Sequence, residues 1–117
     1  MKYLLLLLSL FSFLPFVKSQ CTHTFSGIDS YGDGWNGASV EISVNGVSQG
    51  TLAATGYGSD LTFSADDCDI ITLNWTSGSY DGEISWSISS TGSGGVYADG
   101  VYGTASTSGN CGSASPT

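Results

Sequence analysis

The sequence predicts an all-β protein, folded as a small antiparallel β-sandwich or jelly roll. Apolar and polar residues alternate with a period of two along several short segments, which is typical of strands buried on one face. The 117 residues include 17 glycines, and no stretch places apolar residues at helical spacing. Roughly six to eight short strands, spaced by about ten residues and separated by turn-forming residues, are typical of a sandwich.

Residues 1–19 are expected to be a secretory signal peptide. A basic start at Lys2 precedes the apolar run "YLLLLLSLFSFLPF", which ends before Lys18 and is shorter than a membrane-spanning helix. Small residues lie just before Gln20, the expected first residue of the mature chain. An uncleaved membrane anchor is the alternative. We therefore expect a secreted, extracellular protein.

The mature chain is expected to be one small, strongly acidic domain over 20–105, followed by a Ser- and Gly-rich tail over 106–117. Removing 19 of the 117 residues leaves 98, and it also removes Lys2 and Lys18, the only basic residues. The formal net charge therefore changes from −8 to −10. This charge excludes binding to nucleic acid, or to anionic membranes, by counterion release. It also favours bound cations that neutralise part of it.

The predicted strands follow one another through the mature chain. The first covers 21–28, and "SVEISV" places its apolar residues on one face. Asn45-Gly46 is the preferred pair for a two-residue hairpin turn, from which "VSQGTL" returns. Further strands are "DLTFS", "DIITLNW", "EISWSIS" and a glycine-punctuated strand or hairpin in "GGVYADGVYG". The predicted core contains Val40, Ile42, Val44, Leu61, Phe63, Ile71, Leu73, Trp75, Ile84, Trp86 and Ile88.

The loop "DSYGDGWNG", residues 29–37, is a candidate cation site. Asp29 and Asp33 stand four residues apart among glycines, and Asn36 adds an amide oxygen. Calcium takes about six to eight oxygen ligands, so a second segment must contribute. The alternative is that these side chains form Asx turns and that the glycines only supply positive φ angles.

The second segment is "SYDGEISW", residues 79–86, where Asp81 and Glu83 come just before a predicted strand. If the strands that begin near Cys21 and Cys68 run the same way, their far ends converge at one end of the sandwich. Asp29 and Glu83 then share an ion.

The same assumption brings two of the three cysteines together at the opposite end. We therefore expect a Cys21–Cys68 disulfide, with Cys111 unpaired or engaged in an intermolecular bond.

Aromatic residues in the predicted loops are candidates for carbohydrate binding. Four aromatic residues lie in these loops: Tyr31, Trp35, Tyr57 and Tyr80. All of them except Tyr57 lie beside the acidic residues. Aromatic rings next to carboxylates and amides bind sugars by stacking and by hydrogen bonds to hydroxyls. The alternative is that Trp35 and Tyr80 cover the ends of a thin sandwich.

No catalytic constellation is evident, and we expect a protein that is not an enzyme. His23 is the only histidine, with no cysteine or histidine at zinc-ligand spacing around it. Asp33 and Glu83 are the only clustered acids suited to glycoside hydrolysis, and so small a domain offers no obvious cleft. Asn74 begins an Asn-Trp-Thr sequon for N-glycosylation.

The two acidic segments together resemble a module that recurs in secreted and cell-surface proteins of bacteria, algae and protists. That module pairs a Gly-Asp-Gly-Trp-Asn-Gly loop with a later Gly-x-(Tyr/Phe)-x-x-Glu-(Ile/Thr/Val)-Ser-(Trp/Tyr) segment. Residues 32–37 match the first element, and the resemblance covers about 21–89. The matches to the second element are Gly78, Tyr80, Glu83, Ser85 and Trp86.

The resemblance implies a calcium-stabilised β-sandwich without catalytic residues, used in adhesion, matrix or surface layers. It therefore favours a bound Ca²⁺ over a turn-only role for the loop. The expected function is a structural or adhesive module of an extracellular matrix, surface layer or filament, able to associate with itself or with matrix partners. The alternative is a calcium-dependent, lectin-like module that binds glycans.

Overall fold

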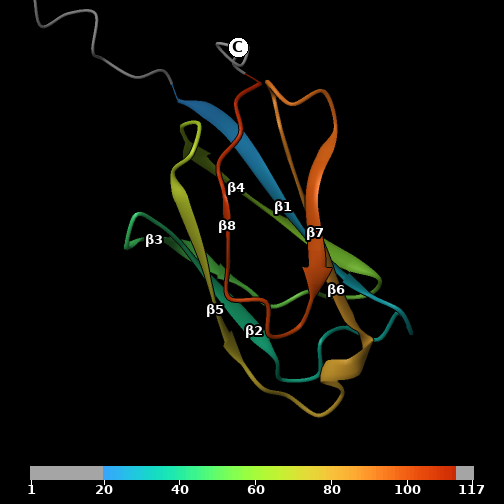
Figure 1. Cartoon of the computed structure of the whole chain (residues 1–117). Helices are drawn as coiled ribbons and strands as arrows, with labels where there is room; N and C mark the ends of the chain where they lie inside the picture. The colour runs from blue at the N-terminus through green and yellow to red at the C-terminus, as the bar shows by residue number, and fades with distance from the viewer. Residues whose placement is uncertain (1–19, 113–117) are drawn as a thin grey trace, which may run out of the picture.

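The computed structural model describes residues 20–112, so the expected signal peptide and the end of the expected tail lie outside the described residues. The described part is all-β, as predicted (Figure 1). Its elements are β1 (Cys21–Asp29), β2 (Ser39–Val44), β3 (Val47–Leu52), β4 (Gly58–Ala65), β5 (Ile70–Thr76), the short 3-10 helix η2 (Asp81–Glu83), β6 (Ile84–Ser90), β7 (Val96–Val101) and β8 (Ser106–Ser108).

Two four-stranded antiparallel sheets pack face to face as a sandwich. The first sheet has the strand order β4-β1-β6-β7, and the second has the order β3-β2-β5-β8. Strands β1 and β5 belong to different sheets and run in the same direction along the sandwich (Figure 1). The assumption that the strands beginning near Cys21 and Cys68 run the same way is therefore correct.

The β2–β3 hairpin is formed as its sequence predicts. Asn45 and Gly46 have φ angles of 50° and 85°, so both central residues of the turn are left-handed. Val44 and Val47 pair across the turn. The Asn45 side chain also accepts a hydrogen bond from the amide of Ile70 at 2.9 Å, which joins the hairpin to the start of β5.

The core lies between the two sheets and contains nearly all the residues predicted for it. Leu61 and Trp75 are only partly buried, whereas Phe25, Trp35 and Leu52 complete the core. The rings of Phe25 and Trp86 stack with their centroids 5.5 Å apart. Inward-facing residues alternate with Ser and Thr along β1 and β6, so the period-two pattern directly reports the buried face.

The C-terminal segment differs from the expected tail. Residues 106–108 form β8, which pairs with β5, and the Tyr97 hydroxyl donates a hydrogen bond to the Ser108 carbonyl at 2.8 Å. The segment then reaches the start of β1, where the amide of Asn110 donates to Nε2 of the buried His23 at 3.1 Å. Residues 106–110 are therefore an integral part of the sandwich.

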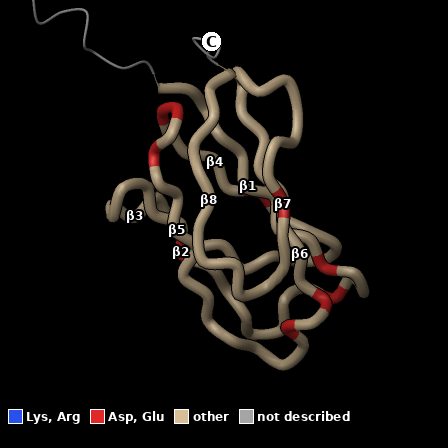
Figure 2. Tube along the Cα trace, viewed as in Figure 1, with Lys and Arg blue, Asp and Glu red and all other residues tan. Residues whose placement is uncertain are grey.

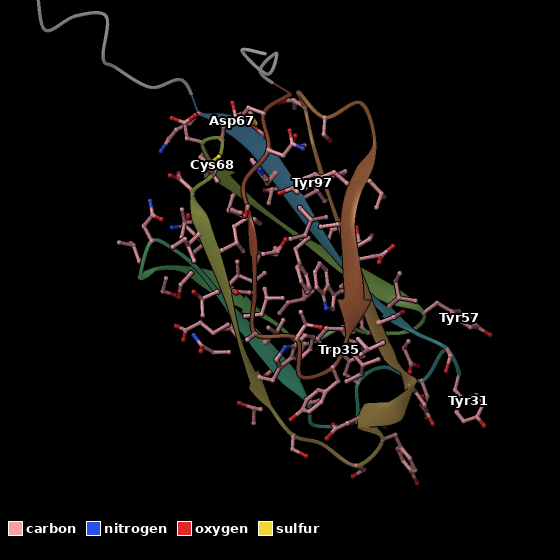
Figure 3. The ribbon with its side chains drawn as sticks, in the orientation of Figure 1. Tyr31, Trp35, Tyr57, Asp67, Cys68 and Tyr97 are labelled. Atoms are coloured by element: carbon pink, nitrogen blue, oxygen red, sulfur yellow. A yellow bond between two sulfur atoms is a disulfide. The ribbon has the colours of Figure 1, made fainter. Side chains whose placement is uncertain are left out.

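The predicted Cys21–Cys68 disulfide is wrong: Cys21 is bonded to Cys111, 90 residues away in the sequence. The physical reason is β8, which carries Cys111 back to the start of β1. Cys68 lies at the same end of the molecule, as expected, but on the β4–β5 turn with its thiol free and exposed (Figure 3). The unpaired cysteine is therefore Cys68 and not Cys111.

Candidate metal centre at the acid pole

Acidic residues gather at the two ends of the sandwich (Figure 2). We call one end the acid pole, defined by Asp29, Asp33, Asp81 and Glu83. The other end is the disulfide pole, defined by the Cys21–Cys111 bond and residues 66–69. No Lys or Arg occurs among residues 20–112, so neither group of acids has a basic side chain to pair with.

Asp29 is the last residue of β1 and points inward, so its side chain is only 1% exposed. Its Oδ2 accepts hydrogen bonds from the amides of Asp33, at 2.8 Å, and of Gly34, at 3.0 Å. The loop can turn back in this way because Gly32 and Gly34 both have a φ of +84°. The glycines predicted to shape the loop therefore direct its amides onto one carboxylate oxygen.

Glu83 reaches the same place from the other acidic segment. Strands β1 and β6 pair with Asp29 opposite Ile84, and Glu83 immediately precedes Ile84. The Glu83 carbonyl accepts a hydrogen bond from the amide of Ser30 at 3.2 Å. Strand pairing thus brings together two acids that are 54 positions apart in the numbering.

Three carboxylates converge at this point. Asp29, Asp33 and Glu83 each contribute an oxygen, and these oxygens all lie within 4.8 Å of one another. Two buried carboxylate oxygens, Oδ1 of Asp29 and Oε1 of Glu83, have no hydrogen-bond partner. A buried polar atom without a partner costs free energy, and a buried negative charge without one costs more. The cluster therefore lacks a positively charged partner.

The pKa values of the two inner acids are shifted in opposite directions. Burial favours the neutral form of Asp29, but hydrogen bonds from Asp33 and the Gly34 amide outweigh it and lower the pKa of Asp29. Burial, and then the negative charges of Asp29 and Asp33, raise the pKa of Glu83. Asp29 is thus the acid that stays ionised, and Glu83 is the acid that resists ionisation.

Either a proton or a divalent cation can reduce the repulsion among the three carboxylates. A proton on Glu83 removes one charge and supplies a donor, whereas a divalent cation neutralises two charges and binds several oxygens at once. Hard cations such as Ca²⁺ and Mg²⁺ prefer oxygen ligands, and three carboxylates are a typical contribution to such a site. The cluster is therefore chemically suited to a hard cation.

Two other residues predicted as metal ligands have different roles. Both carboxylate oxygens of Asp81 are engaged within its own loop, by the Ser77 hydroxyl at 2.6 Å and the Gly78 amide at 2.8 Å. The Asn36 amide nitrogen donates to the Gly34 carbonyl at 2.9 Å, and Asn36 itself has a φ of 51°. Asp81 and Asn36 thus hold their own loops in shape, which is the role that the alternative interpretation gave to Asn36.

The prediction that Trp35 binds a ligand is wrong, because its side chain is only 2% exposed. Its ring packs against Gly27, where a Cβ would lie 2.5 Å from the ring, and its Nε1 donates to the Ile28 carbonyl at 3.1 Å. The missing side chain of Gly27 provides the space that the indole fills. Figure 3 shows Trp35 inside the sandwich.

The predicted tyrosines are accessible, and one more joins them. Tyr31 and Tyr80 are exposed, and so is Tyr57 of the β3–β4 loop, a residue that was predicted to lie in a loop but outside the site. Tyr57 belongs here because its carbonyl accepts the amide of Asp29 at 2.9 Å. No signal in the sequence links that loop to the site. Asn74 of the sequon is exposed on β5, and its glycosylation stays a prediction.

A shallow depression of roughly 360 Å³ lies near the acid pole but does not contain the carboxylate cluster. It is lined by Asp81, Gly82, Ile84, Val101 and Tyr102. The three clustered acids are thus not part of the lining of this depression. Along residues 20–112 there is no helix of the length and apolarity needed to cross a membrane.

The fold and the site define a small antiparallel β-sandwich with three converging carboxylates at one end. Comparison of the chain with protein-family models, with curated proteins and with solved structures finds no match. The resemblance to the extracellular module therefore stays a prediction, and the function is argued from the site.

Proposed function

We propose that this protein is a secreted, non-enzymatic structural or adhesive module whose acid pole is held together by one calcium ion. The observation that carries the proposal is the pair of buried carboxylate oxygens, on Asp29 and Glu83, that lack any partner. They come from two separate segments, and the exposed carboxylate of Asp33 lies within reach of both. An ion there would link the end of β1 to the start of β6.

Calcium suits the cluster better than magnesium does. Its coordination is flexible, with about six to eight oxygens from carboxylates, carbonyls and water, whereas magnesium demands near-ideal octahedral geometry. The cluster combines a buried, a half-buried and an exposed carboxylate, which come from the end of β1, from η2 and from the β1–β2 loop. Extracellular calcium sites of this kind are weak, with dissociation constants of about 10⁻⁴–10⁻³ M, which matches a secreted module.

Secretion is supported by the leader-like start of the sequence and by the disulfide. Disulfides persist mainly in oxidising compartments, which include the extracellular space. The Cys21–Cys111 bond joins the two ends of the described chain.

A structural role is supported by the surface of the first sheet. The outward residues of its two central strands carry no charge: Thr22, Thr24, Ser26 and Ile28 on β1, and Ser85, Ser87 and Ser89 on β6. The centre of this sheet face is therefore uncharged, with Asp60 on β4 and Asp99 on β7 at its two edges. Such a face repels a second copy less than the poles do. Size-exclusion chromatography and electron microscopy of the secreted protein should show concentration-dependent assembly, and a strict monomer at all concentrations would count against self-association.

Calcium-dependent melting tests the metal site. At a calcium concentration about 100-fold above the dissociation constant, binding adds about 2.7 kcal/mol to the free energy of unfolding. For a domain of this size, each 1 kcal/mol raises the melting temperature by roughly 4–8 °C. We expect EDTA to reverse this increase.

Asp33→Asn should abolish the increase, because it removes a ligand charge. The matched control is Asp99→Asn, which removes the same charge from an exposed position on β7 outside the cluster and should keep the increase. Equal melting temperatures of the wild-type protein in calcium and in EDTA would refute the metal site.

A further inference from the structure

We infer that the acid pole is a docking surface for a neutral carbohydrate with adjacent hydroxyl groups, bound by the calcium ion and by the tyrosine rings around it. The inference rests on the proposed calcium site and names the partner of that site. It begins with the aromatic rings. Among the described residues, the exposed rings are those of Tyr31, Tyr57 and Tyr80, with exposed fractions of 74%, 72% and 56%.

The three tyrosines come from three different loops that meet at the acid pole. Tyr31 lies between Asp29 and Asp33 in the β1–β2 loop. The Tyr57 carbonyl in the β3–β4 loop accepts the amide of Asp29 at 2.9 Å. The Tyr80 carbonyl in the β5–β6 connection accepts the amide of Glu83 at 3.1 Å. Tyr57 and Tyr80 are thus joined to members of the carboxylate cluster by backbone hydrogen bonds, and Tyr31 lies between two members in the sequence.

The ring of Tyr57 is held in place although it is exposed. It lies over Gly32, where a Cβ would come within 2.4 Å of the ring. Figure 3 shows Tyr31 and Tyr57 projecting outward from the same side of the molecule. A ring that is already positioned loses little conformational entropy when a ligand stacks on it, which favours binding.

A cation in the cluster would remain open toward this surface. Asp29 is buried and Glu83 is half-buried, so these two ligands lie on the inner side, whereas the exposed Asp33 lies at the surface. Calcium takes about six to eight oxygens, and three carboxylates leave positions that face solvent. Two adjacent hydroxyls of a sugar can replace water at those positions, while the apolar face of the sugar stacks on tyrosine.

The charge of the protein selects the class of sugar. No Lys or Arg is present among residues 20–112 to bind a carboxylate, sulfate or phosphate group on a glycan. The acid pole carries Asp81 beside the three clustered acids, so one calcium ion leaves it negative overall. Anionic glycans are therefore disfavoured, and neutral sugars are the class that the surface fits.

The test is binding of the mature protein to immobilised mannan, galactan and β-glucan, with alginate as the anionic comparison, in calcium chloride and in EDTA. We expect binding to at least one neutral polysaccharide that EDTA abolishes. Tyr31→Ala and Tyr80→Ala should each weaken it about tenfold, as expected for a stacking residue. The control Val96→Ala changes an equally exposed apolar residue on β7 and should bind as the wild type does.

Melting curves separate this inference from the calcium site. Both tyrosine variants should keep the calcium-dependent rise in melting temperature. A wild-type protein that shows the rise but binds no neutral polysaccharide overturns the carbohydrate inference and leaves the calcium site standing. Preference for alginate, or binding that persists in EDTA, also overturns it. Absence of the calcium-dependent rise overturns both proposals.

Discussion

Acidic side chains lie at both poles of the sandwich, but only at the acid pole do they also converge on one another. At the disulfide pole, Asp69 accepts the Asp66 amide at 2.8 Å and the Asn45 side chain at 3.1 Å, and Asp67 accepts the Cys111 amide at 2.6 Å. Those carboxylates hold backbone, and a covalent bond closes the end. At the acid pole, carboxylates from two segments converge on each other.

The comparison of the two poles indicates which feature makes an acidic cluster suited to a cation. The disulfide pole has one buried carboxylate oxygen without a partner, on Asp66, whereas the acid pole has two, from segments joined only by strand pairing. No third carboxylate of the described residues approaches the oxygen of Asp66 to form a comparable group. Convergence of unpartnered oxygens, and not the number of acids, distinguishes the two poles.

Removing the disulfide is expected to have the largest effect. The double variant Cys21→Ala/Cys111→Ala should lower the free energy of unfolding by about 2–5 kcal/mol, because the unfolded chain gains the entropy of a long open loop. Denaturant unfolding measures this. Cys68→Ala is the control and should change stability by no more than about 0.5 kcal/mol. A loss in Cys68→Ala as large as that in the double variant would restore the Cys21–Cys68 pairing, because both variants remove a member of that pair.

Neutralising Glu83 should have a smaller effect whose sign depends on calcium. In EDTA at neutral pH, Glu83→Gln should raise the melting temperature above that of the wild type, because it removes a charge that repels Asp29 and Asp33. In calcium, the order should reverse, because the variant loses a ligand. Glu41→Gln on the exposed face of β2 is the matched control and should show no reversal.

The pH dependence follows from the same shift. A pKa of Glu83 that is higher in the folded state means that folded protein binds more protons above pH 4.5, so calcium-free stability falls as pH rises through that range. The lowered pKa of Asp29 acts the other way, and its contribution is lost below its ordinary pKa of 3.8. A calcium-free melting temperature of the wild type that rises steadily above pH 4.5 would contradict this account. So would a Glu83→Gln variant whose melting temperature has the same pH dependence as that of the wild type.

Much of the fold could be predicted from the sequence because alternation reports which face of a strand is buried. The approach of the two acidic segments to one end was also predicted, from the direction of the strands that are now β1 and β5. The pairing of β1 with β6, which places Asp29 beside Glu83, was not predicted. Strand β8 could not be predicted, because its three residues, Ser-Thr-Ser, carry no apolar alternation. Without β8, nothing indicated that Cys111 returns to Cys21.

The roles of individual site residues depended on contacts that sequence spacing does not encode. Trp35 is buried because Gly27, on another segment, leaves space for its ring. Asp81 lies two residues from Glu83, yet its oxygens bind Ser77 and Gly78 and leave it outside the cluster. The two acidic segments could be identified from the sequence. Which of their residues are candidate ligands and which form turns could be told only from three-dimensional contacts.

The central claim is that the acid pole binds one calcium ion through Asp29, Asp33 and Glu83. Isothermal titration of the mature protein with calcium chloride, in two buffers of different ionisation enthalpy at about pH 5, tests it most directly. The account predicts one ion per chain and net release of protons, since calcium must displace the proton that the raised pKa of Glu83 retains. Absence of saturable binding, or unchanged binding in Glu83→Gln, would contradict it.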